Sequence, residues 1–224
     1  MLFAAQEGHR EVVDALLRSE DVEVNRADEN GVTPLSAAAE GGHVGVVEAL
    51  LGREDIAVNR ADKYGATPLL VATQCGHDRV AELLLERADV DVNRPDEEGS
   101  SPLHEAANVG NAKAVELLLA KEGVRVNQAD MHGATPLASA SLAGHEKVVE
   151  ALLREEGIQV NKADWAGATP LSVAARQRHG AIVGALLRRE EVRTSGWRGW
   201  RPHRRRSQKP KVRRPMATSP PRGW

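Results

Sequence analysis

The sequence predicts an all-α repeat solenoid in which helix-turn-helix units with β-turn fingers stack on one another. Three observations predict this fold class. A turn and helix-start pattern recurs every 34 residues, two short helical segments follow each copy, and aromatic residues make up only 3% of the chain. A fixed period of this size indicates a solenoid, and a core of Ala, Val and Leu in place of aromatic residues suits closely stacked helices.

A repeated pentapeptide opens each unit. It occurs as "GATPL" at 65–69, 133–137 and 167–171, as "GVTPL" at 31–35 and as "GSSPL" at 99–103. An Asp precedes the Gly by three residues, as Asp28 precedes Gly31; the carboxylate accepts bonds from amides ahead of it, and Gly adopts a backbone angle that other residues resist. The Thr, or Ser101 in the third copy, is a helix N-cap, and Pro is favoured next. The pattern therefore ends a turn and begins a helix.

Each pentapeptide begins the first of two short helices. In the first complete unit, Leu35, Ala38 and Ala39 form the apolar face of one helix, which Gly42 ends. The second helix, "VGVVEALL", has an apolar stripe of Val46, Val47, Leu50 and Leu51. A polar loop containing "VN" then returns to the next turn. One unit cannot bury both faces, so neighbouring units must stack.

The period also predicts the organisation of the whole chain. We expect a partial unit at 1–27, units at 28–61, 62–95, 96–129 and 130–163, a degenerate unit at 164–191 and a basic disordered tail at 192–224. The degenerate unit has Arg178 where Gly is expected, and it lacks "VN". Met1 aligns with Leu35, so we expect either a fragment of a longer array or a frayed first unit.

Together, the Asp-x-x-Gly-x-Thr-Pro-Leu pattern, a Gly-His pair, "VVEALL" and "VN" resemble ankyrin repeats over residues 1 to about 191. Tetratricopeptide repeats share the period, but their Trp-Leu-Gly-Tyr pattern is absent. The family's Thr-Pro-Leu-His sequence survives only at His104, so we expect most bonds that this His makes between repeats to be missing. The resemblance implies a non-enzymatic protein interaction scaffold without a cofactor.

The composition indicates in which cellular compartment the protein works, and it argues against a membrane or secreted protein. Cys75 is the single cysteine, so the chain forms no internal disulfide or cysteine zinc cluster, which favours a reducing compartment. No apolar run approaches the roughly 18 residues of a membrane span, and "MLFAAQEGH" is too short for a signal-peptide core. We expect a monomeric, soluble, intracellular protein in the cytoplasm, with no membrane contact.

The recurring histidines do not predict a metal site. They are His9, His43, His77, His145 and His179. Stacked helices lie roughly 8 to 10 Å apart, whereas zinc holds imidazole nitrogens at about 2.1 Å. We interpret them as polar residues that begin the second helix, because Asn111 takes the same position. With no nucleophile elbow and no phosphate-binding loop, we predict no catalytic, metal or cofactor site.

Binding is the function that this pattern favours, because a curved stack offers a long concave face. The candidate contact residues are positions that vary while the frame repeats. At the turn tips they are Glu29, Asn30, Val32, Lys63, Tyr64, Ala66, Glu97, Glu98, Ser100, Met131, His132, Ala134, Trp165, Ala166 and Ala168, and on the first helices Glu40, Gln74, Asn108, Leu142, Arg176 and Gln177. Tyr64, Met131 and Trp165 are the strongest, because such side chains bury much area at little entropic cost. For Trp165, the alternative is that it covers the final repeat.

Charge divides the chain into two parts. All 32 acidic residues and 19 of the 30 Lys and Arg residues precede residue 192, which gives that part a net charge of −13 and predicts a basic protein partner. The tail holds 11 basic residues and no acid. Its "RRRSQKPKVRR" predicts nuclear import or nucleic-acid binding, with Trp197 and Trp200 stacking on bases. A third interpretation is a gene-model artefact, because the repeat pattern stops abruptly.

One modification site follows from the resemblance alone. Leu85, Asp91, Val92 and Asn93 match the spacing that asparaginyl hydroxylases accept in ankyrin proteins. The favoured alternative is that Asn93 is structural and bonds the adjacent turn.

Overall fold

The computed structural model describes residues 1–19 and 21–189, and over these ranges the chain forms twelve α-helices and no strand. The first helices of successive units are α1 (Leu2–Gln6), α3 (Pro34–Glu40), α5 (Pro68–Cys75), α7 (Pro102–Val109), α9 (Pro136–Ala143) and α11 (Pro170–Gln177). The second helices are α2 (Arg10–Leu17), α4 (Val44–Leu51), α6 (Asp78–Glu86), α8 (Ala112–Leu119), α10 (Glu146–Arg154) and α12 (Gly180–Leu187). The disordered tail predicted for 192–224 lies outside the described residues.

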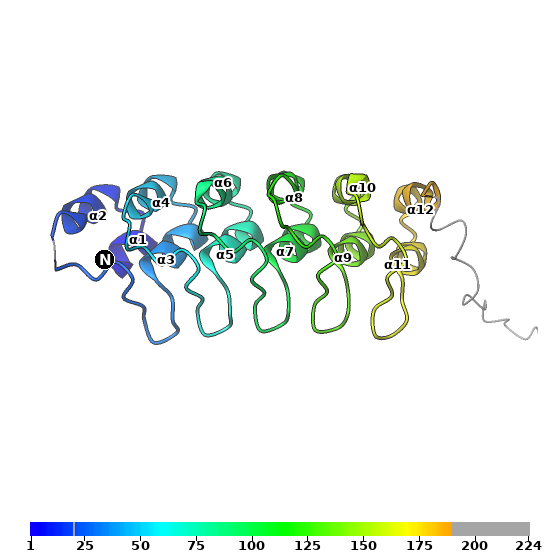
Figure 1. The fold of residues 1–224 in the computed structure, drawn as a ribbon, viewed down its shortest axis with the longest axis horizontal. Helices are drawn as coiled ribbons and strands as arrows, with labels where there is room; N and C mark the ends of the chain where they lie inside the picture. The colour runs from blue at the N-terminus through cyan, green and yellow to red at the C-terminus, as the bar shows by residue number, and fades with distance from the viewer. Residues whose placement is uncertain (20, 190–224) are drawn as a thin grey trace, which may run out of the picture.

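The helices form two parallel rows, with a finger-shaped turn projecting beside each first helix from α3 onward (Figure 1). Each first helix packs on the first helix of the next unit, as α5 does on α7, and each second helix packs on the next second helix. One continuous core runs from Ala4 to Leu186. The predicted all-α repeat solenoid is confirmed.

The first helices begin as the pentapeptide predicts. The Thr67 hydroxyl accepts a hydrogen bond from the Leu70 amide at 3.2 Å, and Pro68 occupies the first helical position. The same cap occurs at Thr33, Ser101, Thr135 and Thr169. Helix α1 has no side-chain cap. Because each cap satisfies an amide that the helix leaves unbonded, it fixes the point at which the finger becomes a helix.

The fingers are tight turns that bond to one another. In the first finger, the Asp28 carboxylate accepts bonds from the Asn30 and Val32 amides, both at 2.9 Å, and Gly31 has φ +83°. Neighbouring fingers are joined by a backbone bond, as when the Glu97 amide donates to the Tyr64 carbonyl at 2.9 Å. The variable residues at the tips are therefore held in one row.

The second helices bury most of the predicted stripe. Val46, Val47 and Leu50 are at most 1% exposed, whereas Leu51 is half-buried. Within residues 1–19 and 21–189, no helix has the length and apolar character needed to cross a bilayer.

The histidines at the start of the second helices bond the preceding unit, which the sequence did not reveal. They occupy the N-cap position without capping their own helix, and their Nε2 atoms lie 2.8 to 3.2 Å from carbonyl oxygens 37 residues earlier. The pairs are His43 with Gln6, His77 with Glu40, His145 with Asn108 and His179 with Leu142. Asn111 caps its own helix instead and donates to Asp78 at 2.7 Å.

The loop asparagines form a second set of bonds between units. Asn93 donates to the Gly123 carbonyl at 2.9 Å and accepts from the Arg125 amide at 2.8 Å. Asn25, Asn59 and Asn127 make the same pair of bonds. These bonds are those expected of a structural asparagine.

Candidate partner-binding face

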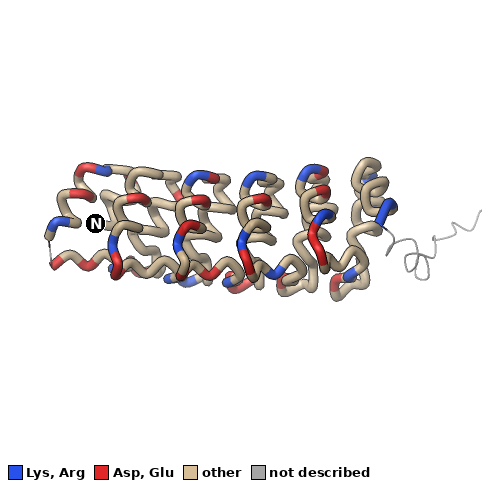
Figure 2. Tube along the Cα trace, turned by 45° about the horizontal axis from the view of Figure 1, so that its top comes forward, with Lys and Arg blue, Asp and Glu red and all other residues tan. Residues whose placement is uncertain are grey.

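The fingers and the first helices together form one side of the stack, which we call the finger face. It comprises the fingers 28–32, 62–66, 96–100, 130–134 and 164–168 with helices α3, α5, α7, α9 and α11. The opposite side, formed by the second helices and the loops that follow them, is the second-helix side. Figure 2 shows Lys and Arg next to Asp and Glu along the second-helix side.

Most contact residues predicted from the sequence are exposed on the finger face, but not all of them. Val32, Ala66, Ala134 and Ala168 are half-buried, and Ser100 is buried, so these five positions do not point outward as expected. Among the exposed apolar ones, Trp165 is 79% exposed, Tyr64 61% and Met131 48%. The structure brings about half of the set together in a single groove, which is lined in part by Asn30, Val32, Glu40, Lys63, Tyr64, Ala66, Gln74, Glu97, Glu98 and Asn108. The remaining predicted residues do not line it; they are Glu29, Ser100, Met131, His132, Ala134, Leu142, Trp165, Ala166, Ala168, Arg176 and Gln177.

The groove has a volume of ≈ 700 Å³ and runs along the first three fingers, over helices α3, α5 and α7. Lys63 is the single basic residue that lines it, and its ammonium group is already engaged. Lys63 Nζ lies 4.9 Å from the centre of the Tyr64 ring and donates to Asn30 Oδ1 at 2.6 Å. The exposed ring of Tyr64 therefore already contacts a cation.

Six carboxylates line the same groove: Glu40, Asp62, Asp96, Glu97, Glu98 and Glu105. Asp62 and Asp96 accept amide bonds within their own fingers. Glu105, on α7, is half-buried, and burial raises the pKa of its carboxyl. The charges of Asp96 and Glu98 raise that pKa further, against a hydrogen bond with Ser100. The groove is therefore strongly acidic.

Trp165 contacts the finger before its own. A Cβ atom added to Gly133 would lie 2.6 Å from Trp165 Cδ1, so the indole packs over that glycine. The ring thus covers Gly133 of the preceding unit and still leaves most of its surface exposed.

Cys75 is exposed and is one of the residues that line the groove. Partial burial raises the pKa of its thiol, and the nearby charge of Glu40 raises it further. The thiol therefore stays protonated at neutral pH, which is opposite to the requirement for a reactive cysteine.

Ser, His and Asp side chains meet at one place, but their geometry is not that of a catalytic triad. His104 Nε2 lies 2.6 Å from Ser139 Oγ and 3.8 Å from Asp130 Oδ2. A triad needs the carboxylate on Nδ1 and the serine on Nε2, whereas here both partners share one nitrogen. Burial lowers the pKa of His104, and the charges of Asp130 and Asp96 raise it in part. This cluster joins α7 to α9, as the family's histidine was expected to do.

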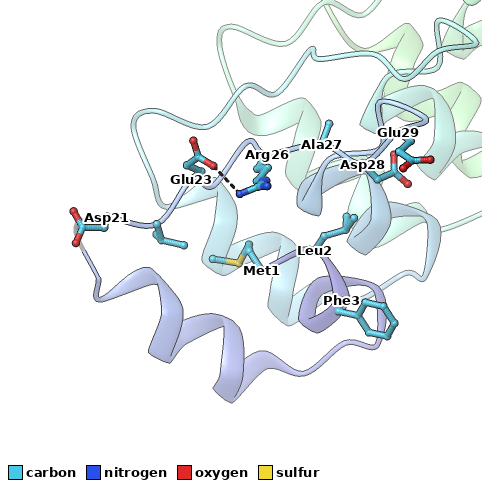
Figure 3. Close-up of a pocket in the computed structure, with 10 residues that line it drawn as sticks. Met1, Leu2, Phe3, Asp21, Glu23, Arg26, Ala27, Asp28 and Glu29 are labelled. Carbon is cyan, nitrogen blue, oxygen red and sulfur yellow. Dashed lines mark hydrogen bonds and ion pairs between the residues drawn. The ribbon is translucent and has the colours of Figure 1, made fainter.

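A second hollow lies at the N-terminal end of the stack (Figure 3). It has a volume of ≈ 850 Å³ and is lined by Met1, by residues of α1 and by residues of the segment 21–29. Phe3, at its edge, is 80% exposed, and Arg26 lies 3.4 Å from Glu23. Of the predicted contact residues, this hollow includes Glu29 alone.

The fold and the finger face define a helical repeat protein with an extended row of exposed, variable side chains. Comparison with known proteins gives the family. A family described as ankyrin repeats (3 copies) matches residues 1–96 and 89–164, and the chain belongs to the ankyrin repeat family. Proteins of this family generally mediate protein–protein interaction and are generally non-enzymatic.

A solved structure supports the same fold. The crystal structure of EF0377, an ankyrin repeat protein, aligns with 84% of this chain and 96% of its own chain, with 24% sequence identity and a TM-score of 0.78. At this identity the likeness concerns the fold, which hosts many different binding functions. No curated protein matches the sequence.

Proposed function

We propose that this chain is a non-enzymatic scaffold that binds another protein through its finger face. The observation that carries this proposal is the concentration of exposed large apolar side chains on one side of the stack. Of the eight such residues within the described ranges, the five on the finger face are Tyr64, Val109, Met131, Leu142 and Trp165. Single exposed apolar residues are ordinary on protein surfaces, whereas a row of them on rigid elements favours an interface.

The charge of the stack suggests the kind of partner. Residues 1–191 carry a net charge of −13. A basic partner would be drawn to this surface by long-range attraction, which speeds association at low salt and is screened at high salt. We therefore expect association to slow as the ionic strength rises.

The test is an affinity capture with a matched pair of variants. The full chain carrying Tyr64→Ala, Met131→Ala and Trp165→Ala should fail to retain a protein that the parent retains. The control replaces exposed apolar residues on the second-helix side, with Val12→Ala and Leu187→Ala, and should retain it. If both variants retain the same proteins, the finger face is not the binding surface.

A second candidate function rests on the tail, whose residues lie outside the described part of the chain. Residues 192–224 contain 11 basic residues and no acidic one, a composition suited to nucleic-acid binding or nuclear targeting. Deleting residues 192–224 tests it. Unchanged localisation together with unchanged binding to single-stranded probes would rule the tail function out.

A further inference from the structure

The acidic residues of this molecule fall into two groups that differ in their partners. On the second-helix side, several carboxylates pair with arginines of the same chain, as Asp55 does with Arg53 at 2.9 Å and Asp89 with Arg87 at 3.0 Å. Arg53 and Arg87 hydrogen-bond these carboxylates and lower their pKa values. The chain thus compensates much of the negative charge on that side by itself.

The groove is different. Among the described residues, none of its six carboxylates forms an ion pair with a Lys or Arg, and its one basic residue, Lys63, bonds Asn30 instead. Glu105 is half-buried there, beside Glu98 and Asp96. Like charges gathered in a hollow raise the free energy of the unbound protein, and a cation from outside would relieve that cost.

The Tyr64 ring adds a selective feature to this charge. A planar guanidinium group can lie flat on an aromatic ring and pair with a carboxylate through two parallel bonds, whereas an ammonium group, such as that of Lys63, contacts the ring only as a point charge. Tyr64 is 61% exposed and lies in the same groove as Glu98 and Glu105. This combination favours arginine over lysine.

The stacking period sets the spacing of the basic residues. Neighbouring stacked helices are separated by roughly 8 to 10 Å. A polyproline II segment rises about 3.1 Å per residue with three residues per turn, so every third side chain points the same way, about 9 Å apart. An arginine at every third position would therefore meet successive fingers of the groove.

We propose that the groove over α3, α5 and α7 binds an extended segment of a partner protein that bears arginine at every third position. The guanidinium groups lie among Glu98, Glu105 and the Tyr64 ring. This inference rests on the proposed scaffold function, and it names the partner chemistry and the part of the finger face that binds it.

The experiment is a titration of the full chain with labelled ten-residue peptides, followed by fluorescence anisotropy. The first peptide has three arginines spaced three residues apart, with Pro and Ser between them. The second has the same composition with the three arginines adjacent, and the third has Glu in place of Arg. We expect the spaced peptide to bind at least about fivefold more tightly than the adjacent one, and the Glu peptide not to bind.

Variants of the full chain locate the binding site. Glu98→Gln with Glu105→Gln should weaken binding of the spaced peptide by about tenfold, because the pairs at exposed Glu98 and half-buried Glu105 each contribute a few-fold. The matched control, Glu116→Gln with Glu150→Gln, removes two exposed carboxylates from the second-helix side and should change affinity less than twofold. Lys63→Gln should tighten binding by about threefold, which keeps the test valid if the loss variant misfolds.

Equal weakening by the groove pair and the control pair would show attraction to net charge alone and would overturn the proposal, as would equal affinity for the spaced and adjacent peptides. If the chain with Arg204→Gln, Arg205→Gln and Arg206→Gln bound the spaced peptide more than fivefold more tightly than the parent, the occupant would be the chain's own tail, and the proposal would be wrong. The captured partner of the scaffold test could still depend on Met131 and Trp165, so the proposed function would survive these failures.

Discussion

The two adjacent residues of the Gly-His pair contact two different units. Gly42 precedes His43, but its own close contact is His77, in the next unit: a Cβ atom on Gly42 would lie 2.5 Å from His77 Nδ1. Gly42 also has φ +68°, which favours glycine. Glycine is therefore required here both by the backbone angle and by the ring that lies against it.

Gly76 has the same backbone angle requirement but no histidine ring against it, because the next unit has Asn111 in place of histidine. Gly76 has φ +76°, yet a Cβ atom there would meet nothing within 4 Å. We expect Gly76→Ala to cost about 1 kcal/mol, the strain of an L-residue in this region. Gly42→Ala should cost about 2 kcal/mol, because His77 must also move and weaken its bond to Glu40. Urea unfolding measures both, and equal costs would show that the histidine ring contributes nothing.

Arg178 is the one non-glycine residue with positive φ in the described part of the chain, at +65°. It occupies the position that Gly144 holds one unit earlier. We expect Arg178→Gly to raise the free energy of unfolding of the last unit by up to about 1 kcal/mol, since relief of strain exceeds the added backbone entropy of the unfolded chain. Arg178→Ala should give no such gain. Hydrogen exchange of the α11 and α12 amides is the measurement, and equal protection in both variants would contradict the strain argument.

For whole elements, the sequence was sufficient to predict the caps, turns and buried stripes within one unit. It was not sufficient to predict the hydrogen bonds that join two units. The caps at Thr67 and Ser101, the Asp28 turn and the buried Leu50 stripe follow from spacings of one to four residues, and the structure confirms them. The histidine bonds span 37 residues. A repeat shows that these residues recur, but recurrence does not say which neighbouring unit they contact.

The candidate site divides in the same way. Exposure of the residues at the first two variable positions of each finger followed from their place in the period, and these residues are exposed. The position after the finger glycine was predicted wrongly, because Ser100 is buried and the other residues at this position are half-buried. The grouping of Tyr64 with Glu105 in one groove did not follow, because Glu105 is on the first helix of the next unit and is not one of the variable positions from which contact residues were predicted. The one sequence feature that could have identified Glu105 is that it directly follows His104, the only histidine in a Thr-Pro-Leu-His type of sequence.

The loop asparagines join neighbouring elements most directly, and Asn59 is a suitable probe. Its amide donates to the Asp89 carbonyl at 2.6 Å and its carbonyl accepts from the Asp91 amide at 2.8 Å. We expect Asn59→Ala to cost about 2 kcal/mol, since two bonds between units are lost. Asn59→Asp keeps the acceptor and should cost about half as much. The measurement is chemical unfolding followed by circular dichroism. If Asn59→Asp lowers the free energy of unfolding as much as Asn59→Ala does, the acceptor bond contributes nothing and the expectation is wrong.

At the scale of the whole molecule, the stack separates its charge by side. The helices pack mainly on their nearest neighbours along the array, so no distant segment covers the finger face within the described residues. Pairing with arginine compensates carboxylates of the second-helix side, whereas no carboxylate of the groove pairs with a Lys or Arg among the described residues. Burial beside Asp96 and Glu98 makes the charged form of Glu105 costly, and a cationic partner would relieve this cost on binding.

The cost of that arrangement depends on pH in a definite direction. Burial, with the nearby charges of Asp96 and Glu98, raises the pKa of Glu105 in the folded chain. The unfolded chain therefore releases this proton first, and the contribution of Glu105 to stability falls as pH rises from its ordinary pKa to the raised one. Glu105→Gln removes the penalty, so its unfolding temperature should match the parent at pH 3.5 and exceed it by up to about 2 °C at pH 7.

Thermal unfolding from pH 3.5 to pH 8 tests this. The control is Glu116→Gln on the second-helix side, whose unfolding temperature should differ from that of the parent by the same amount at every pH. Added salt should shrink the gain only in part, because screening weakens the repulsion from Asp96 and Glu98 but leaves the cost of burial. A gain of equal size at every pH would mean that Gln packs better than Glu, and that the groove stores no electrostatic free energy at this residue. If the unfolding temperature of Glu105→Gln exceeds that of the parent only above the ordinary pKa of a carboxyl group, the electrostatic cost lies at Glu105.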